Sequence, residues 1–300
     1  MNGAKKIRNA YLKYSAAMLL SSTNGVVASL IELSSYEIVF LRALLGFGVL
    51  CALFFATGRR LTFFRHKRDA AFLALSGVAQ GANWLFLFEG YDHIGVSLVT
   101  LINYFGPVII IAFTPLLLKE KLVWPKLLAL IAALSGVFLI SGQAAVEGLS
   151  PWGLLCAGLS AFGFAAMVLC NKLSKHIDGM EASTILLFFS ALTVTVFLGC
   201  KQGFCLDISV ADWPPVLWLG LMNTGLSAYC YFSSINVLPA QTVAVCGYLE
   251  MLCAVLLSVV LLHETMLPLQ ILGAALVLGG ALFGECYHPK TPPAAKDGPT

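Results

Sequence analysis

Two charged side chains lie inside long apolar stretches of the sequence. Glu250 falls near the centre of the run 240–262, and Arg42 lies about two turns from the end of an earlier run. In a membrane-spanning helix each charge would cost about 2.5–3.5 kcal/mol, so each needs a partner or a function. Arg42 could pair with Glu37 or Glu32, or extend to the interface, and Glu250 could be a structural hydrogen-bonding group. Alternatively, both charges have a functional role, and Glu250 binds substrate or carries a proton, which suits a carboxyl group shielded from water.

Four apolar runs carry polar or aromatic side chains at helical spacing. Residues at i, i+3 and i+4 share one face of a helix, so each set points in one direction. Amides, hydroxyls and rings that converge can bind a small molecule with polar and apolar parts. The other interpretation of each amide is an interhelical hydrogen bond, worth roughly 0.6–2 kcal/mol. The candidate substrate-binding residues are Gln80, Asn83, Trp84, Asn103, Tyr104, Asn223, Ser227, Tyr231 and Tyr248.

The sequence leaves the direction of Glu250 open. Tyr248 precedes it by two residues, which places the two side chains about 200° apart around a helix. If Tyr248 faces a central cavity, Glu250 faces a neighbouring helix, and the reverse holds equally.

Motifs for catalysis or for metal and cofactor binding are missing from the sequence. It has no HExxH or GxSxG motif, no phosphate-cradling loop and no metal-ligand spacing. The nine cysteines fall mostly in apolar runs, where cysteine acts as a small hydrophobic residue. Cys200 and Cys205 flank a loop and could pair in an oxidising compartment. We therefore expect a protein without enzymatic activity, metal or cofactor.

Membrane-spanning helices are the elements that must position these groups. The chain is 59% apolar and 11% charged, whereas soluble domains carry about 25% charged residues. Its apolar runs of about 20 residues are long enough to cross a bilayer as helices, and backbone hydrogen bonding in lipid favours an all-α bundle. We expect an all-α integral membrane protein with ten transmembrane helices, at residues 14–31, 36–57, 70–90, 95–118, 124–142, 152–171, 182–200, 214–235, 240–262 and 267–285.

The basic residues predict the orientation of these helices. If the ten helices alternate in direction, sixteen of the eighteen lysines and arginines fall on one side. Of the other two, Lys201 lies on the opposite side and Arg42 lies within a helix. The positive-inside rule then places both termini in the cytoplasm. A multi-pass protein of the plasma membrane (the inner membrane of a bacterium) is expected, with no nucleic-acid partner.

An internal repeat divides the chain into two halves. The halves align without gaps at a shift of 144 residues, and five crossings per half, an odd number, insert the second half upside down. We expect repeats at 1–143 and 144–286, followed by a disordered cytoplasmic tail at 287–300. Inverted repeats of this kind are typical of alternating-access transporters. The paired residues are Gly81 and Gly225, Phe88 and Phe232, Tyr104 and Tyr248, Glu120 and Glu264, and Gly136 and Gly280.

Nearly the whole chain resembles the EamA-type transporters of the drug/metabolite transporter superfamily. Arg42 matches an arginine that the family often carries in its second helix, and Met251 stands where the family commonly has proline. The other matching segments are Asn103-Tyr104-Phe105-Gly106-Pro107, Lys119-Glu120-Lys121, Gly136, Tyr248-Leu249-Glu250-Met251, His263-Glu264 and Gly279-Gly280.

The resemblance implies an exporter of ten helices that uses no ATP. Its central cavity would be lined mainly by helices 1, 3, 4, 6, 8 and 9, with helices 5 and 10 at the periphery. Family substrates include amino acids, other small metabolites, nucleotide sugars and amphipathic drugs. We expect a secondary transporter that exports amino acids or related metabolites; the alternatives are an intramembrane enzyme and a receptor or scaffold. The coupling ion and the oligomeric state are left open.

Overall fold

The computed structural model describes residues 2–286 except 29, 59–60, 95, 121, 142–149, 178, 202, 204–207 and 262–267. All regular structure within these residues is helical. Several features of the sequence lie outside the described residues, namely Arg59, Arg60, Lys121, Cys205, His263, Glu264 and the tail 287–300. The pairing of Cys200 with Cys205 and the order of the tail therefore stay predictions.

Each of the ten predicted segments contains helix, and three of them are divided. The first helix begins at Asn2 rather than at residue 14, because the polar residues that precede the apolar run are also good helix formers. The elements are α1 (Asn2–Ser22), α2 (Asn24–Ala28), α3 (Ser35–Ala56), α4 (Lys67–Ile94), α5 (Val96–Asn103), α6 (Gly106–Leu117), α7 (Trp124–Ser141), α8 (Pro151–Leu173), α9 (Gly179–Lys201), α10 (Trp213–Trp218), the π-helix η2 (Leu219–Leu226), α11 (Ser227–Ile235), α12 (Ala240–Leu261) and α13 (Pro268–Cys286).

The helices have the length and composition of membrane spans. Within the described residues, α3, α4, α8 and α9 are long and apolar enough to cross a bilayer, and shorter apolar helices occur in α6, α7, α12 and α13. Many large apolar side chains remain exposed on these helices; Leu116 and Trp124, for example, are each 74% exposed. Lipid is the solvent in which such a surface is stable.

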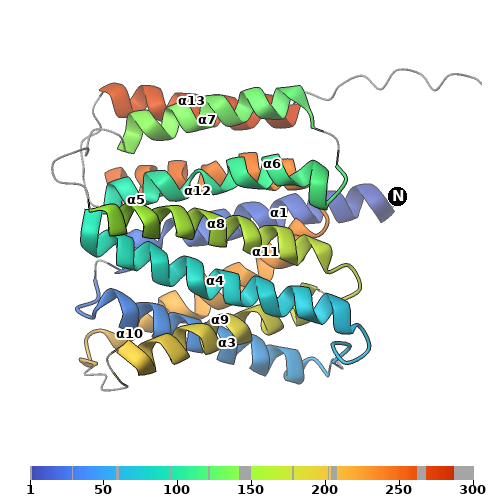
Figure 1. Ribbon diagram of the computed structural model, residues 1–300, viewed down its shortest axis with the longest axis vertical. Helices are drawn as coiled ribbons and strands as arrows, with labels where there is room; N and C mark the ends of the chain where they lie inside the picture. Colours follow the sequence, from blue (N-terminus) through green and yellow to red (C-terminus); the bar gives the residue numbers. More distant parts are fainter. Residues whose placement is uncertain are drawn as a thin grey trace, which may run out of the picture.

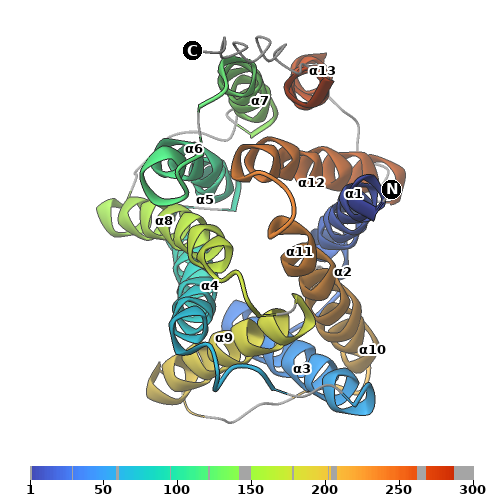
Figure 2. The same cartoon turned by 90° about the vertical axis from the view of Figure 1, so that its right-hand side faces the viewer.

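The helices form a ring when they are viewed along their axes (Figure 2). In Figure 1 they run side by side across the view, and the N terminus marks one end of the bundle. We call this end, which also holds the loops 61–66 and 174–177, the basic end, and its opposite the outer end. The helices α7 and α13 pack together outside the ring, in agreement with a peripheral position for the fifth and tenth segments.

Glycines on α7 and α13 make reciprocal contacts. A Cβ atom added to Gly136 would lie 2.4 Å from the carbonyl oxygen of Gly273, and one added to Gly280 would lie 2.8 Å from that of Ala129. Gly273 follows Ala129 by the same 144 residues that separate the two glycines. The two helices therefore touch through equivalent positions of the two halves, in antiparallel directions.

The same shift relates contacts elsewhere in the bundle. Gly81 on α4 packs against Thr193 of α9, and Gly225 in η2 packs against Val49 of α3. Val49 and Thr193 are again 144 residues apart. The repeat read from the sequence thus corresponds to a repeated pattern of packing.

Two adjacent glycines of α13 give a matched test of this packing. We expect Gly280→Ala to destabilise the protein by about 1–3 kcal/mol, since the new methyl group must displace the backbone of α7. In contrast, Gly279→Ala adds a methyl group where no atom lies within 4 Å, and alanine favours the helix. Thermal unfolding of the purified protein in detergent measures both variants, and equal losses would contradict this account.

Candidate functional site

Glu250 on α12 lies at the centre of a group of side chains that come from several helices. Its carboxylate interacts electrostatically with Arg42 on α3, Tyr91 on α4, Tyr104 between α5 and α6, and Tyr231 on α11. All five side chains are only partly buried. They come from α3, α4, the α5–α6 connection, α11 and α12, and we call them the central group.

Arg42 is held by residues that come from both halves of the chain. Its Nε donates a hydrogen bond of 3.0 Å to Oγ1 of Thr224, and its guanidinium group lies 4.9 Å from the ring centre of Trp84. Of the partners considered from sequence, Glu37 instead accepts hydrogen bonds from Ser34 in a capping box at the start of α3.

The opposite charges of Arg42 and Glu250 attract each other without direct contact. No nitrogen–oxygen distance of 4 Å or less joins them in the described part of the chain, although each charge acts on the other. A guanidinium group and a carboxylate that attract each other across a gap can hold the two ends of a molecule that carries both charges.

Tyr248 has a packing position, and Glu250 points away from it. The ring of Tyr248 is fully buried, and its hydroxyl donates a hydrogen bond of 2.8 Å to the carbonyl oxygen of Tyr104. The two rings are also in contact, with centroids 5.9 Å apart. Because residues 248 and 250 point about 200° apart, Glu250 lies away from this contact and interacts with Arg42, Tyr91 and Tyr231 on other helices.

The break between α5 and α6 provides the acceptor for Tyr248. The α-helical pattern is interrupted at Phe105, whose amide bonds the carbonyl of Ile102, immediately before Gly106 and Pro107. Pro107 has no N–H group to continue the helix, and the amide of Val108 turns to the carbonyl of Phe105. The carbonyl oxygen of Tyr104 is therefore left for a partner on another helix.

The three amide side chains among the remaining candidates of the first half differ in their contacts and burial. Asn83 donates a hydrogen bond of 2.6 Å to the carbonyl of Ser160 on α8, which is the interhelical interpretation of an amide. Gln80 is also buried, with 8% of its surface exposed, whereas Asn103 at the end of α5 is partly exposed.

Asn223 and Ser227 join the second half to the first helical segment. The Asn223 amide nitrogen donates to Thr23 and Asn24, at 2.8 and 3.0 Å. Ser227 is hydrogen bonded to Ser21 and to the carbonyl of Ala17. Both side chains thus contribute to packing between α11, η2 and the segment α1–α2.

Two residues at this site are absent from the sequence candidates, namely Tyr91 of the central group and Thr224, which accepts the hydrogen bond from Arg42. Tyr91, whose hydroxyl lies 3.2 Å from Oγ1 of Thr100, falls beyond the predicted end of its helix at residue 90. Thr224, the partner of Arg42, lies in the π-helix η2, a type of turn that often marks functional sites. In neither case does residue type distinguish these positions from other hydroxyls in the chain.

A pocket of about 650 Å³ opens at the basic end of the bundle. It lies between the ends of α6 and α8 and the start of α12, and Lys126, Lys172 and Lys175 contribute to its lining. Glu120, another lining residue, accepts hydrogen bonds from the first amide of α12, so it caps that helix. Among the described residues, no cluster of three or more His, Cys, Asp or Glu side chains is placed to hold a metal.

Comparisons with known proteins identify the family. The chain matches the EamA-like transporter family at residues 9–142 and again at 151–283. It is 25% identical to the uncharacterized transporter YxxF of Bacillus subtilis (strain 168), over 92% of this chain and 89% of that protein. It is 22% identical to a probable terminal-alkyne amino-acid exporter of Streptantibioticus cattleyicolor, over 72% of this chain and 73% of the exporter.

A solved crystal structure shows the same fold. It superposes with a TM-score of 0.78 at 18% identity, and the match covers 93% of this chain and 99% of that one. The two consecutive matches to the family account for both halves of the sequence. The chain belongs to the EamA-like transporter family and is a multi-pass membrane protein.

Proposed function

We propose that the protein is a secondary transporter that exports amino acids or related small metabolites by alternating access. The observation that carries this proposal is the pair of opposite charges, Arg42 on α3 and Glu250 on α12, which act on each other without direct contact. A relative named as a probable amino-acid exporter supports the substrate class.

In this proposal the two charges bind the two ends of an amino acid. The guanidinium group of Arg42 holds the substrate carboxylate, because arginine binds carboxylates in a two-pronged geometry. The carboxylate of Glu250 holds the ammonium group. The rings of Trp84, Tyr104 and Tyr231 then contact the substrate side chain.

The alternating-access part of the proposal rests on ten transmembrane helices in two inverted repeats, 1–143 and 144–286. The reciprocal contacts of Gly136 with Gly273 and of Gly280 with Ala129 support it, as do two consecutive family matches. The central group draws residues from both halves, as expected for a site at the repeat interface near the membrane midplane. The basic loops favour cytoplasmic termini in the plasma membrane (the inner membrane of a bacterium).

A flux assay tests the substrate class. Liposomes that contain the purified protein and an unlabelled amino-acid mixture should exchange a labelled amino acid much faster than protein-free liposomes. A panel of amino acids and other metabolites then ranks the substrates by initial rate. Failure to accelerate the exchange of any amino acid on the panel would contradict the proposed function.

A further inference from the structure

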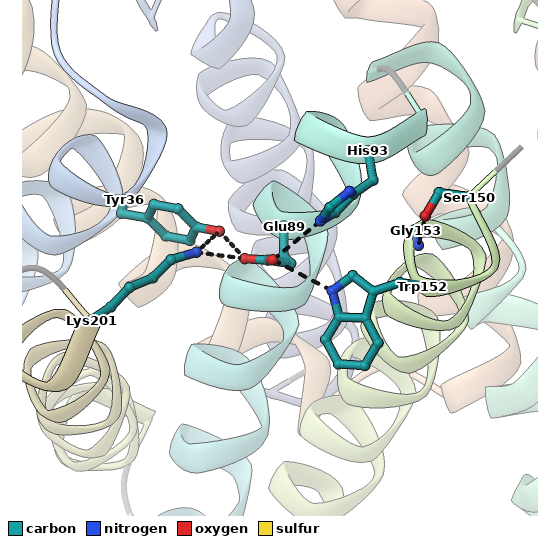
Figure 3. Close-up of polar contacts among 7 residues, drawn as sticks. All are labelled: Tyr36, Glu89, His93, Ser150, Trp152, Gly153 and Lys201. Carbon is teal, nitrogen blue, oxygen red and sulfur yellow. Dashed lines mark hydrogen bonds and ion pairs between the residues drawn. The ribbon is translucent and has the colours of Figure 1, made fainter. Parts of the chain in front are cut away.

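Five side chains, with Glu89 in the middle, meet at the outer end of the bundle (Figure 3). Nζ of Lys201 lies 2.8 Å from one carboxylate oxygen, which also accepts a hydrogen bond from the Tyr36 hydroxyl. The other oxygen lies 3.4 Å from Nε1 of Trp152 and 3.4 Å from Nε2 of His93. We call these five residues the Glu89 network.

The Glu89 network joins the two halves of the chain. Glu89 lies near the end of α4 and Tyr36 near the start of α3, both in the first half. In the second half, Lys201 ends α9 and Trp152 lies in the first turn of α8. Any motion that separates α4 from α8 and α9 at this end must therefore break contacts of a carboxylate.

Glycine packing brings α4 and α8 together at the same place. A Cβ atom on Gly153, next to Trp152, would lie 2.7 Å from Ile94 and 2.8 Å from His93. Ser150 fixes the start of α8 through a hydrogen bond of 3.3 Å from the Gly153 amide. The outer ends of α4 and α8 are thus held together by close packing as well as by the hydrogen bond between Trp152 and Glu89.

The equivalent place in the other half has different contacts. The 144-residue shift relates Glu89 to Ser233 on α11 and relates α8 to α1. Ser233 lies at the basic end, where it and Tyr229 accept hydrogen bonds of 3.3 and 3.2 Å from Lys13 of α1. No carboxylate takes part in these contacts of the described residues, and the pocket of about 650 Å³ opens beside the end of α11.

The difference between the contacts of Glu89 and those of Ser233 bears on how the two halves move. In alternating access, one end of the pathway is closed while the other is open, and the two halves exchange their arrangements. We propose that the Glu89 network is the latch that closes the outer end of the pathway, and that Glu89 must separate from Lys201 and Trp152 before substrate leaves. This inference rests on the alternating-access mechanism proposed above.

The native Cys253 reports on the opening of this latch. It lies between Glu250 and the outer end of α12, is partly buried and interacts electrostatically with Glu250. A membrane-impermeant maleimide added outside intact cells reaches it when the outer end opens. Mass spectrometry of its peptide separates its labelling from that of the exposed Cys200.

We expect Glu89→Gln and Lys201→Gln each to speed the labelling of Cys253 by about three- to tenfold, because charge-assisted hydrogen bonds of the closed state are lost. Asp69→Asn is the matched control. Asp69 also joins the two halves, through the amides of Lys175 and His176, but it does so at the basic end. Cys253 in the Asp69→Asn variant should not be labelled from outside faster than Cys253 in the wild type.

The double variant Glu89→Lys with Lys201→Glu restores an ion pair with exchanged charges, and its labelling should return toward the wild-type rate. Wild-type labelling rates in both folded single variants would overturn the latch. The readout needs no substrate, so it is independent of the flux assay. Faster Cys253 labelling in the variants, together with no amino-acid flux in the wild type, supports the latch and contradicts the proposed substrate class. Amino-acid flux together with unchanged Cys253 labelling supports the substrate class and contradicts the latch.

Discussion

Replacing Arg42 with methionine is expected to lower the rate of amino-acid exchange by at least about 30-fold. Removing one partner of a buried, hydrogen-bonded charge pair costs about 2 kcal/mol or more, and each 1.4 kcal/mol is a factor of ten. The proposed partner of Arg42 is the substrate carboxylate. The initial rate of labelled amino-acid exchange in proteoliposomes measures the loss.

Comparing exchange of an amino acid with exchange of its amide shows whether Arg42→Met loses recognition of the carboxylate or is damaged in its structure. The amide keeps the ammonium group and side chain but has no carboxylate, so Arg42→Met should slow its exchange much less than that of the free amino acid. Thr224→Val removes only the hydrogen bond of 3.0 Å from Arg42 and should have a smaller effect. Arg68→Met, at the basic end where the guanidinium lies over Phe72, is the matched control for loss of an arginine. Equal losses for acid and amide would contradict the role of Arg42.

The architecture of this chain is readable from sequence because lipid imposes strong patterns. Each span must be helical and apolar over about 20 residues, so ten segments are visible without any packing information. The 144-residue shift is also visible, because residues such as Gly136 and Gly280 are needed at equivalent close contacts. Packing requirements of this kind leave the same residue type at both copies of a repeat.

The central charges were also detectable, because a charge inside an apolar run is conspicuous. Arg42 and Glu250 come from segments that are far apart in sequence, and the structure brings them close enough to act on each other. Their partners were not predictable. The sequence offered Glu37 for Arg42, but the chain folds so that Thr224 and Trp84 lie beside it.

The polar faces show the limit of helical periodicity. Spacing fixes which residues share a face, but it does not fix how the helix is rotated about its axis. Asn83 therefore faces α8, and Tyr248 packs against Tyr104, while Glu250 interacts with Arg42 on α3. The π-helix η2 makes the predicted faces less accurate. Its wider turn changes the angle around the helix axis between Asn223 and Tyr231 from the angle expected for an α-helix.

The Glu89 network was missed for a different reason. Glu89 and Lys201 lie near helix ends, where charged residues are common and cost little. Nothing in their spacing relates residue 89 to residue 201. Only the packing of α4 against α8 and α9 brings them within 2.8 Å.

Replacing Glu250 with glutamine is expected to abolish the dependence of transport on a pH gradient. In the mechanism proposed above, the Glu250 carboxylate holds the ammonium group of the substrate. We further propose that the same carboxylate holds a proton when the substrate has left. Glutamine has nearly the same size and can still form hydrogen bonds, but it cannot carry the proton. One pH unit corresponds to 1.36 kcal/mol, so one-for-one exchange of substrate for a proton would accumulate substrate about tenfold on the acidic side.

The measurement uses proteoliposomes whose interior is one pH unit more acidic than the outside, with the membrane potential held at zero by potassium and valinomycin. Wild-type protein should accumulate labelled amino acid inside, and Glu250→Gln should reach only the outside concentration. Glu120→Gln changes a carboxylate that caps α12 outside the central group, so it should retain the gradient dependence. Accumulation by Glu250→Gln equal to that of the wild type would remove Glu250 from proton coupling, whereas accumulation on the alkaline side would rule out exchange of substrate for a proton at this carboxylate.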